Sequence, residues 1–376
     1  MEAERKDNIL QGAVGLATER RLAGYGVVDY AAQVQGYLRQ QPEVEEVRDY
    51  RASDLTVRFQ DKTQVAVLLG REELYGGGPA TPAPAAPSAS PAYRDPPHPG
   101  WIKAGVIDPL WDDWPPQSTP LDIVSTLQAQ GYRVQHIKGQ AVDLSFMTTF
   151  DHQHYGVVFI RTHGGVEWVG NDQKLHIMVR PFFDTVPPAS GYTGTGVMYV
   201  GTDWGYKYAY SFNDQFVSTY MTTPPFPDTL MHLLVCYGAA VEAQNDMIPA
   251  FLSRGAGCYT GWTLTASSTY GDPAAVTFFQ RMAAGDTVAQ AIAHIAASGS
   301  SPDPNTGAVL VAHGDDGMHL QLPYIGNKRS KELHQPTCRW VRRMSLRNVK
   351  FFETVEEALR QGYNGCATCL RQFDTG

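Results

Sequence analysis

The chain has 376 residues, of which 43% are hydrophobic and 18% are charged, and its formal net charge is −8. These values are ordinary for a globular protein of two or three domains and exclude a disordered or collagen-like chain. The charge is uneven, because the last 51 residues carry +5 and the remainder carries −13. The five cysteines are odd in number and no secretion signal or membrane span is recognised, which predicts a cytoplasmic protein without a disulfide scaffold.

Residues 1–75 are predicted to form a small accessory α/β domain. Ala31–Gln40 has the apolar spacing of a helix, and Leu55–Phe59 and Gln64–Leu69 alternate like the strands of a hairpin. Residues 76–100 are rich in Pro, Ala, Gly and Ser, which predicts an extended linker. Such an exposed segment is a candidate for self-cleavage.

Residues 101–325 alternate strand and helix patterns, which predicts an α/β domain with a parallel-rich sheet flanked by helices. Within it, Val166–Thr223 is dominated by Gly, Tyr and Thr, as expected for inserted β-hairpins. The other expected strands are Lys103–Ile107, Tyr132–Ile137, Gly156–Arg161, Leu230–Cys236, Gly257–Thr263, Ala308–Ala312 and Met318–Leu322. Helices are expected to begin at Ser118 or Thr119, at Asp246, at Asp272 and at Thr287.

Two of the expected strands end in residues that suit catalysis. The uninterrupted apolar strand Gly156–Arg161 leads to His163, Gly164 and Gly165, and the second strand ends in Cys236. Open α/β sheets place their chemistry at the carboxyl ends of such strands. A thiol beside an imidazole can act as a nucleophile, and the N–H groups of Gly164 and Cys236 can form an oxyanion hole. Cys258, at a strand start, is expected to be a packing residue.

This arrangement of strand-His-Gly followed by strand-Cys resembles the caspase-like cysteine peptidases of clan CD, in particular their gingipain- and clostripain-like members. The resemblance runs from roughly Ala104 to Ile295 and includes Gly255–Thr263 and Phe278–Ala291. It implies a caspase-like fold and a catalytic dyad of His163 and Cys236 that hydrolyses peptide bonds through an acyl-enzyme.

Substrate specificity is less well defined by the sequence. His163 and Cys236 are 73 residues apart and the caspase residues around the cysteine are missing, so aspartate specificity is not expected. A basic P1 residue, as in the bacterial relatives, would need an acidic pocket. The candidates for the pocket or its wall are Asp108, Asp112, Asp113, Asp214, Asp272 and Trp262.

Residues 326–376 carry a second signal. His334 and Cys338 form one closely spaced pair, and Cys366 and Cys369 form another, which predicts a tetrahedral structural Zn²⁺ site. A segment of this size builds only a small core, so the metal would supply folding free energy.

The same stretch resembles the metal-binding domain of Ada-type DNA alkylation-repair proteins, through HQPTCRW at His334–Trp340 and through Gly362, Tyr363, Cys366 and Cys369. His334 stands where those proteins carry their methyl-accepting cysteine, which argues against methyl transfer. The basic side chains of the module can contact nucleic-acid phosphates, although a solvated charged face is slightly favoured. They are Arg339, Arg342, Arg343, Arg347 and Lys350.

Three functions remain open from the sequence. The first is a caspase-like cysteine endopeptidase. The second is an inactive caspase-like scaffold that binds a partner and is targeted by its zinc module. The third is a nucleic-acid-associated protein, which the charge of −13 outside the C-terminal module disfavours.

Overall fold

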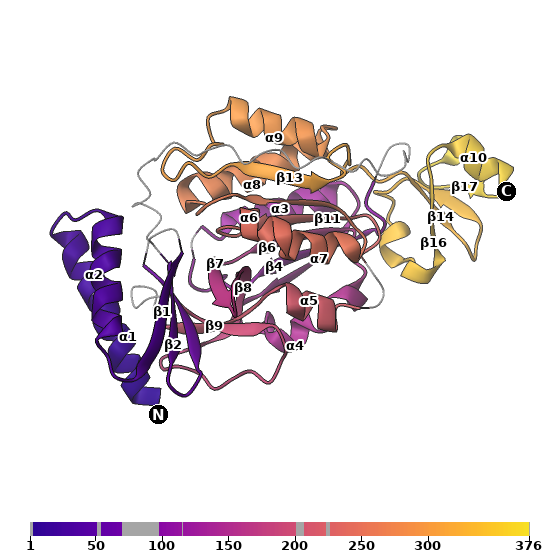
Figure 1. The fold of residues 1–376 in the computed structure, drawn as a ribbon. Coiled ribbons are helices and arrows are strands. Elements are labelled where there is room, and N and C mark those ends of the chain that lie inside the picture. The colour runs from indigo at the N-terminus through magenta and orange to yellow at the C-terminus, as the bar shows by residue number, and fades with distance from the viewer. Residues whose placement is uncertain are drawn as a thin grey trace.

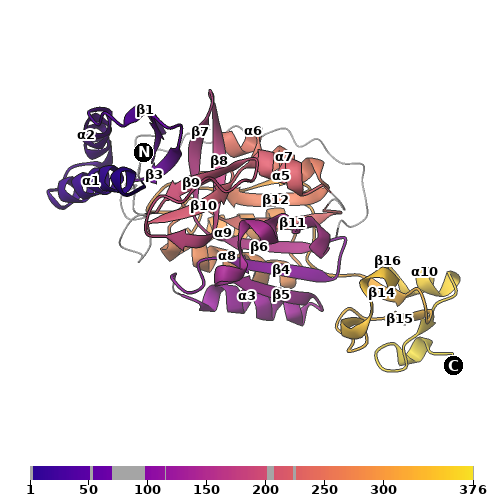
Figure 2. The same ribbon diagram turned by 90° about the horizontal axis from the view of Figure 1, so that it is seen from below.

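The computed structural model describes residues 3–50, 54–69, 98–114, 116–200, 207–222 and 226–375. The expected linker at 76–100, which is the candidate segment for self-cleavage, lies almost entirely outside the described residues. Figures 1 and 2 show a central α/β body with two helices beside it at the N-terminal end and a small module at the opposite, C-terminal end. No helix in the described ranges is long and apolar enough to cross a lipid bilayer.

The body is built on a six-stranded sheet with the order β13-β12-β11-β6-β4-β5. All neighbouring pairs are parallel except β12 and β13, which are antiparallel. The expected parallel-rich sheet is thus present. Its strands are β4 (Lys103–Asp108), β5 (Arg133–Lys138), β6 (Val157–Arg161), β11 (Thr229–Leu234), β12 (Ala256–Trp262) and β13 (Leu310–Gly314).

Helices cover both faces of this sheet. One hydrophobic core joins the sheet to α3 (Ser118–Ala129), α8 (Ser268–Ala283) and α9 (Val288–Ala297). A second core lies on the other face, with α4 (Leu144–Met147), α5 (Asp214–Tyr220), α6 (Val241–Asn245) and α7 (Met247–Ser253). Every residue of β6 and β11 is buried, which explains their continuous apolar runs.

Helix boundaries follow local chemistry with two exceptions. Thr287 caps α9 in a reciprocal capping box with Gln290, as predicted. The expected caps at Ser118 or Thr119 are wrong, because α3 begins at Ser118 after Gln117 and has no side-chain cap. Pro273 lies inside α8, which begins five residues before it, at Ser268. The expected strand Met318–Leu322 forms only an isolated bridge between His319 and Thr287.

A second sheet has seven strands in the order β1-β2-β3-β9-β10-β8-β7. The N-terminal part supplies α1 (Ala3–Leu22), α2 (Val27–Arg39), β1 (Val44–Tyr50), β2 (Asp54–Phe59) and β3 (Gln64–Leu68). The predicted hairpin insert supplies β7 (Gly164–Val169), β8 (Asp172–Phe183), β9 (Thr195–Tyr199) and β10 (Tyr208–Phe212). Because β3 pairs with β9 in parallel, the accessory domain and the insert share one sheet.

This sheet curls until its last strand returns to its first (Figure 2). The Trp168 N–H donates to Thr56 Oγ1 at 3.1 Å, and the Arg48 guanidinium donates to the carbonyl of Gly170 at 2.7 Å. Side chains of β3, β7, β8, β9 and β10 therefore face one another inside a nearly closed curl.

The C-terminal module has a four-stranded sheet with the order β16-β14-β15-β17. Its elements are β14 (Tyr324–Asn327), β15 (Glu332–His334), β16 (Val349–Phe352), α10 (Val355–Arg360) and β17 (Asn364–Gly365). Short 3₁₀ turns complete the described chain at Gly139–Ala141, Asp151–Gln153, Val341–Arg343, Leu346–Asn348 and Arg371–Phe373.

Candidate active site and zinc centre

His163 lies at the corner where β6 passes into β7. The Met178 N–H donates to the carbonyl of His163 at 3.0 Å, and Thr162 Oγ1 donates to the carbonyl of Met178 at 3.0 Å. The indole of Trp114 stacks on the His163 imidazole with 5.0 Å between ring centroids and 26° between planes. The ring is therefore held between a strand end and an aromatic wall.

Cys236 follows β11, the strand that lies next to β6. Leu234 pairs with Arg161, so His163 and Cys236 each stand two residues past this pair at one edge of the sheet. The Thr162 N–H donates to the carbonyl of Leu234 at 3.2 Å. The structure thus brings together the two segments that the sequence singled out.

The chain turns sharply after Cys236. Tyr237 has a φ of 60°, a left-handed conformation that is uncommon for a bulky residue. Its N–H donates to the carbonyl of Leu264 at 3.0 Å, and Tyr259 Oη donates to the carbonyl of Gly238 at 2.7 Å. Cys236 is half-buried, and its Sγ lies 4.0 Å from the carbonyl of Ala266. A fixed turn therefore leaves this cysteine partly exposed at the strand end.

A buried charge cluster lies beside this edge. The Arg161 guanidinium is 2.9 Å from Asp272 Oδ1 and 3.3 Å from Asp108 Oδ2, and all three side chains are almost fully buried. It also donates to the carbonyl of Trp114 at 3.1 Å and lies 5.3 Å from the Trp114 ring centroid. Arg161 thus holds two carboxylates and orients the tryptophan that stacks on His163.

Burial shifts the protonation of these groups. It lowers the pKa of His163 to about 3, with Arg161 as a second cause. Burial also raises the pKa of Asp108 to about 6 and raises the pKa of Asp272, against the opposing effect of Arg161. At neutral pH His163 is a neutral imidazole that can accept a proton.

A small cavity of about 10 Å³ adjoins Cys236, room for about one water molecule. Its lining includes side chains from four parts of the chain that meet only in the fold: Trp114, Arg161, Cys236, Ala266, Ser268 and Asp272. Of these, the sequence had singled out Cys236 and Asp272. The signal for Arg161 is its position as the one charge in the buried strand VVFIR.

The other predicted pocket residues lie elsewhere. Asp214 pairs with Lys174 at 2.7 Å, and Asp113 pairs with Arg180. Asp112 lies against Gly139: a Cβ atom on Gly139 would stand 2.6 Å from Asp112 Oδ2. Trp262 could either wall the cleft or pack in the core, and it is fully buried in the core with α3, α8 and α9. Its side chain supplies apolar area to that core.

The predicted metal ligands converge in the C-terminal module. One ligand atom from each of His334, Cys338, Cys366 and Cys369 lies within 4.8 Å of the others. Tetrahedral zinc needs ligand atoms roughly 3.5–4 Å apart, and three sulfurs with one nitrogen are a usual structural donor set. His334 is buried, and its Nδ1 has no hydrogen-bond partner within the described ranges. Backbone N–H groups of Gln335 and Thr368 donate to Cys369 Sγ and Cys366 Sγ at 3.4 Å, which stabilises these sulfurs as thiolates.

An exposed basic surface lies beside this centre. Trp340 is 41% exposed, and the guanidinium carbons of Arg339 and Arg343 lie 5.0 and 5.8 Å from its ring centroid. Arg342 and Arg347 are also exposed, and Lys350 is half-buried. The charges that the sequence singled out are thus at the surface of the module.

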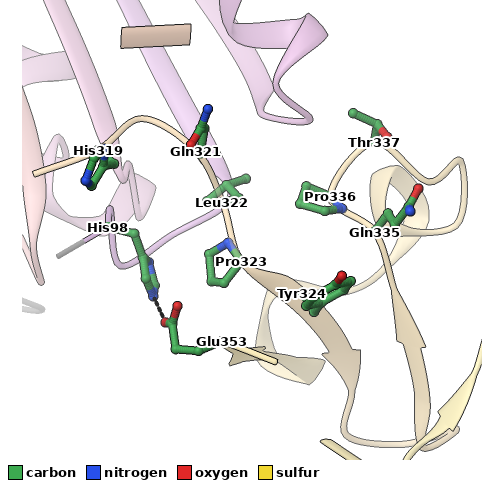
Figure 3. A pocket seen from close by; sticks show the side chains of 10 residues that line it. All are labelled: His98, His319, Gln321, Leu322, Pro323, Tyr324, Gln335, Pro336, Thr337 and Glu353. Carbon is green, nitrogen blue, oxygen red and sulfur yellow. Dashed lines mark ion pairs between the residues drawn. The ribbon is translucent and has the colours of Figure 1, made fainter. Parts of the chain in front are cut away.

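The module packs on the body at the start of β5. The Arg133 guanidinium donates to the carbonyls of Val341 and Met344, and a Cβ at Gly131 would lie 2.6 Å from the carbonyl oxygen of Pro336. A pocket of about 520 Å³ lies at this junction. In Figure 3 His98 reaches Glu353 across one side of it, with an Nε2–Oε1 distance of 3.3 Å. The two units therefore meet through specific contacts.

Comparison with known proteins matches residues 321–371 to the family described as the metal binding domain of Ada. No curated protein matches the chain. The family match covers the C-terminal module alone, and the donor set and the converging ligand atoms agree with it. This module is therefore similar to the metal binding domain of Ada and holds a structural zinc ion through His334, Cys338, Cys366 and Cys369.

Proposed function

We propose that the body is a cysteine endopeptidase of the caspase-like type, with Cys236 as nucleophile and His163 as its acid–base partner. The observation that supports this most directly is the placement of both residues past the paired ends of adjacent parallel strands. Carboxyl ends of parallel strands are where α/β proteins place reacting groups. The half-buried thiol, the stacked imidazole and the rigid turn after Cys236 support the same assignment.

The chemistry begins with a neutral imidazole, because burial lowers the pKa of His163 to about 3. His163 accepts the thiol proton as Cys236 Sγ attacks the scissile carbonyl. The tetrahedral intermediate collapses to a thioester as His163 gives that proton to the leaving amine. Water then attacks the thioester, with His163 as base, and releases the carboxylic acid and the thiol.

The negative oxygen of the intermediate needs fixed donors. Gly164 has no side chain, so its backbone can lie directly against the Cys236 segment. We assign the N–H groups of Gly164 and Cys236 to the oxyanion hole, where a single donor is typically worth about 10²–10³ in rate.

The buried charges near Cys236 favour a basic P1 residue. Two carboxylates, on Asp108 and Asp272, share one guanidinium, so the ionised cluster has a net charge of −1. A cationic P1 side chain compensates this charge, whereas an acidic one adds to it. Because the cavity beside the thiol has room for about one water, substrate must open this site on binding.

That closed cavity is also the observation that favours a second candidate, an inactive caspase-like scaffold. In this alternative the body binds a partner without cleaving it, and the zinc module directs the protein to its target. Basic exposed residues around Trp340 would serve either a nucleic acid or an acidic protein. Binding of duplex DNA that falls steeply with salt would select the nucleic acid.

The test uses the full-length, zinc-loaded protein and peptide amides that differ only at P1. We expect cleavage after Arg or Lys, lost in Cys236→Ala, and covalent labelling of Cys236 by a thiol-reactive peptide probe. Cys258→Ala is the matched control, because Cys258 is fully buried and burial raises the pKa of its thiol. Labelling of Cys236 without cleavage of any peptide would favour the scaffold. If Cys236 is not labelled and no peptide is cleaved, the peptidase proposal is refuted.

A further inference from the structure

A second concave site lies far from the zinc centre, at the mouth of the curled sheet. Its volume is about 790 Å³, within the range of small-molecule pockets. We call it the hairpin cleft. Its walls come from α1, the β2–β3 turn, the strands β3, β7, β8, β9 and β10, and the segment before β9. The lining includes Lys6, Gln64, Glu167, His176, Gly196 and Tyr210.

Two titratable side chains are buried at the base of this cleft. Glu167 is 2% exposed and His176 is 1% exposed, and Glu167 Oε2 lies 3.5 Å from His176 Nε2. The other carboxylate oxygen, Oε1, accepts from Gln64 Nε2 at 2.6 Å. Oε2 has no hydrogen-bond partner in the part of the chain that the structure describes. A buried polar atom without a partner is costly, and here it borders a cleft.

The tautomer of His176 follows from its neighbours. Asn213 Oδ1 accepts from the N–H groups of Gln215 and Phe216 as a helix cap, so Asn213 Nδ2 is the atom that faces His176 Nε2, at 3.3 Å. His176 Nε2 is therefore an acceptor, and Nδ1–H donates to Ser211 Oγ at 3.0 Å. Burial lowers the pKa of His176 to about 3, which keeps this ring neutral.

His176 Nε2 already accepts from Asn213, so an ionised Glu167 turns its Oε2 towards an occupied acceptor 3.5 Å away, and Oε2 has no donor among the described residues. Burial raises the pKa of Glu167 to about 7, which reflects the cost of this buried carboxylate. A donor with positive charge would satisfy Oε2 and compensate the negative charge of Glu167. An ammonium group suits this geometry, because it is compact and carries three N–H donors.

A glycine packs directly against the pair, so that a side chain at this position would press on Glu167. A Cβ atom at Gly196 would lie 2.5 Å from Glu167 Oε2 and 3.0 Å from His176 Cε1. Aromatic and apolar groups from Val186, Tyr192 and Tyr210 line the cleft and can pack on an alkyl chain. Lys6, the nearest cation on α1, is engaged by Asp61 at 2.6 Å and Thr63 at 2.6 Å.

We propose that the hairpin cleft is a binding site for a protonated amine, whose ammonium group donates to Glu167 Oε2 while its alkyl chain lies along the cleft. This site is separate from Cys236. It is connected to the candidate active site by one hydrophobic cluster inside the curl, which includes Met178 and Met198 and reaches Trp114. The amine is a small molecule or a lysine side chain of a peptide.

The test is isothermal titration calorimetry on the full-length protein with n-butylammonium chloride, with 1-butanol and sodium butyrate as neutral and anionic isosteres. We expect saturable binding of the ammonium alone. Glu167→Gln should weaken it at least tenfold, and Cys236→Ala should leave it unchanged. Asp172→Asn is the matched control, because it removes the same charge from an exposed position on β8.

The peptides Gly-Lys-Gly and Gly-norleucine-Gly distinguish the two sources of the amine. Binding of the lysine peptide at least tenfold tighter than butylammonium identifies a peptide side chain, and equal affinity identifies a small amine. Gly196→Ala is the second variant, because its methyl group crowds the site beside Glu167 and leaves the charge of Glu167 in place. If Glu167→Gln does not fold, the effect of Gly196→Ala on ammonium binding tests the proposal instead. Binding of butanol as tight as butylammonium, or binding unaffected by the variant that folds, would overturn the proposal.

Discussion

Gly164 lies directly against Cys236: a Cβ atom on Gly164 would stand 2.5 Å from the carbonyl oxygen of Cys236 and 2.3 Å from Val235 Cγ1. Real Cβ atoms do not approach a backbone oxygen so closely. Any side chain at position 164 must therefore separate the β6–β7 corner, which carries His163, from the turn that carries Cys236.

We expect Gly164→Ala to lower peptidase activity about 10²-fold, because a displacement of about 1 Å between reacting groups costs that much. The measurement is kcat/KM on a peptide amide cleaved by the wild type, together with the thermal midpoint. Gly36→Ala on α2 is the control, since a Cβ there meets nothing within 4 Å. Wild-type kcat/KM in Gly164→Ala would refute the assigned contact.

The cluster of Arg161, Asp108 and Asp272 predicts a large stability effect. Arg161→Met leaves two buried carboxylates without their cation, and we expect the free energy of unfolding to fall by about 3–5 kcal/mol. The double variant Arg161→Met/Asp272→Asn should lose less than the two single variants together. Guanidinium unfolding measures these values.

Arg58→Met is the control for that experiment. The Arg58 side chain is 35% exposed and pairs with Glu45 at 3.1 Å, so its loss should cost less than about 1 kcal/mol. Equal losses of unfolding free energy in Arg58→Met and Arg161→Met would show that the buried cluster stabilises the fold no more than an exposed ion pair does.

Periodicity and strand ends were sufficient to predict the central sheet, the hairpin insert and the zinc ligands. A buried parallel strand such as β6 has a continuous apolar run, and paired His and Cys ligands have a recognisable spacing. The sequence could not predict that β3 pairs with β9, because pairing between distant strands leaves no local pattern. The partners of Arg161 and of Glu167 were unpredictable for the same reason, since they come from separate segments.

The misplaced helix start at Asp272 has a local cause. Pro273 follows Asp272, and Asp-Pro is a usual helix opening, but α8 begins at Ser268 and its first turns accommodate the proline. Asp272 is instead drawn into the buried pair with Arg161. Tertiary electrostatics therefore decide the role of a residue that the local pattern assigns to a cap.

His232 predicts how stability depends on pH. It is fully buried on β11, where Thr260 Oγ1 lies 2.8 Å from its Nδ1 and the Phe278 ring lies 4.5 Å away. Burial lowers its pKa to about 3 from the ordinary 6.5, so between these values the unfolded chain binds more protons than the folded one. Stability is therefore lost as pH falls from about 6.5 towards 3.

The measurement compares wild type and His232→Phe by guanidinium unfolding at pH 7.5 and 5.0. We expect the wild type to lose about 2 kcal/mol more than the variant over this interval, because one pKa unit corresponds to about 1.4 kcal/mol. Other buried groups also make stability depend on pH, but they are present in both proteins. His163 and His176 act in the same direction as His232, and Glu167 acts in the opposite direction. Identical losses in both proteins would contradict a buried neutral His232.

Zinc removal provides the last prediction. The module has a small core of its own around Leu333 and Phe352, and four ligands from separated segments converge beside it. We expect one zinc ion per chain by mass spectrometry under native conditions. A strong chelator should remove it and make residues 326–375 sensitive to protease, because metal binding supplies much of the folding free energy of such modules.

Cys338→Ser should lower the zinc content in the same way, whereas Cys258→Ala, a buried thiol on β12, should retain one ion. Because the Arg133 guanidinium contacts the carbonyls of Val341 and Met344, loss of the metal should also release the module from β5. Hydrogen exchange at β5 reports this release. A module that keeps its protease resistance without zinc would show that its apolar core and the contacts of Arg133 are sufficient for its fold.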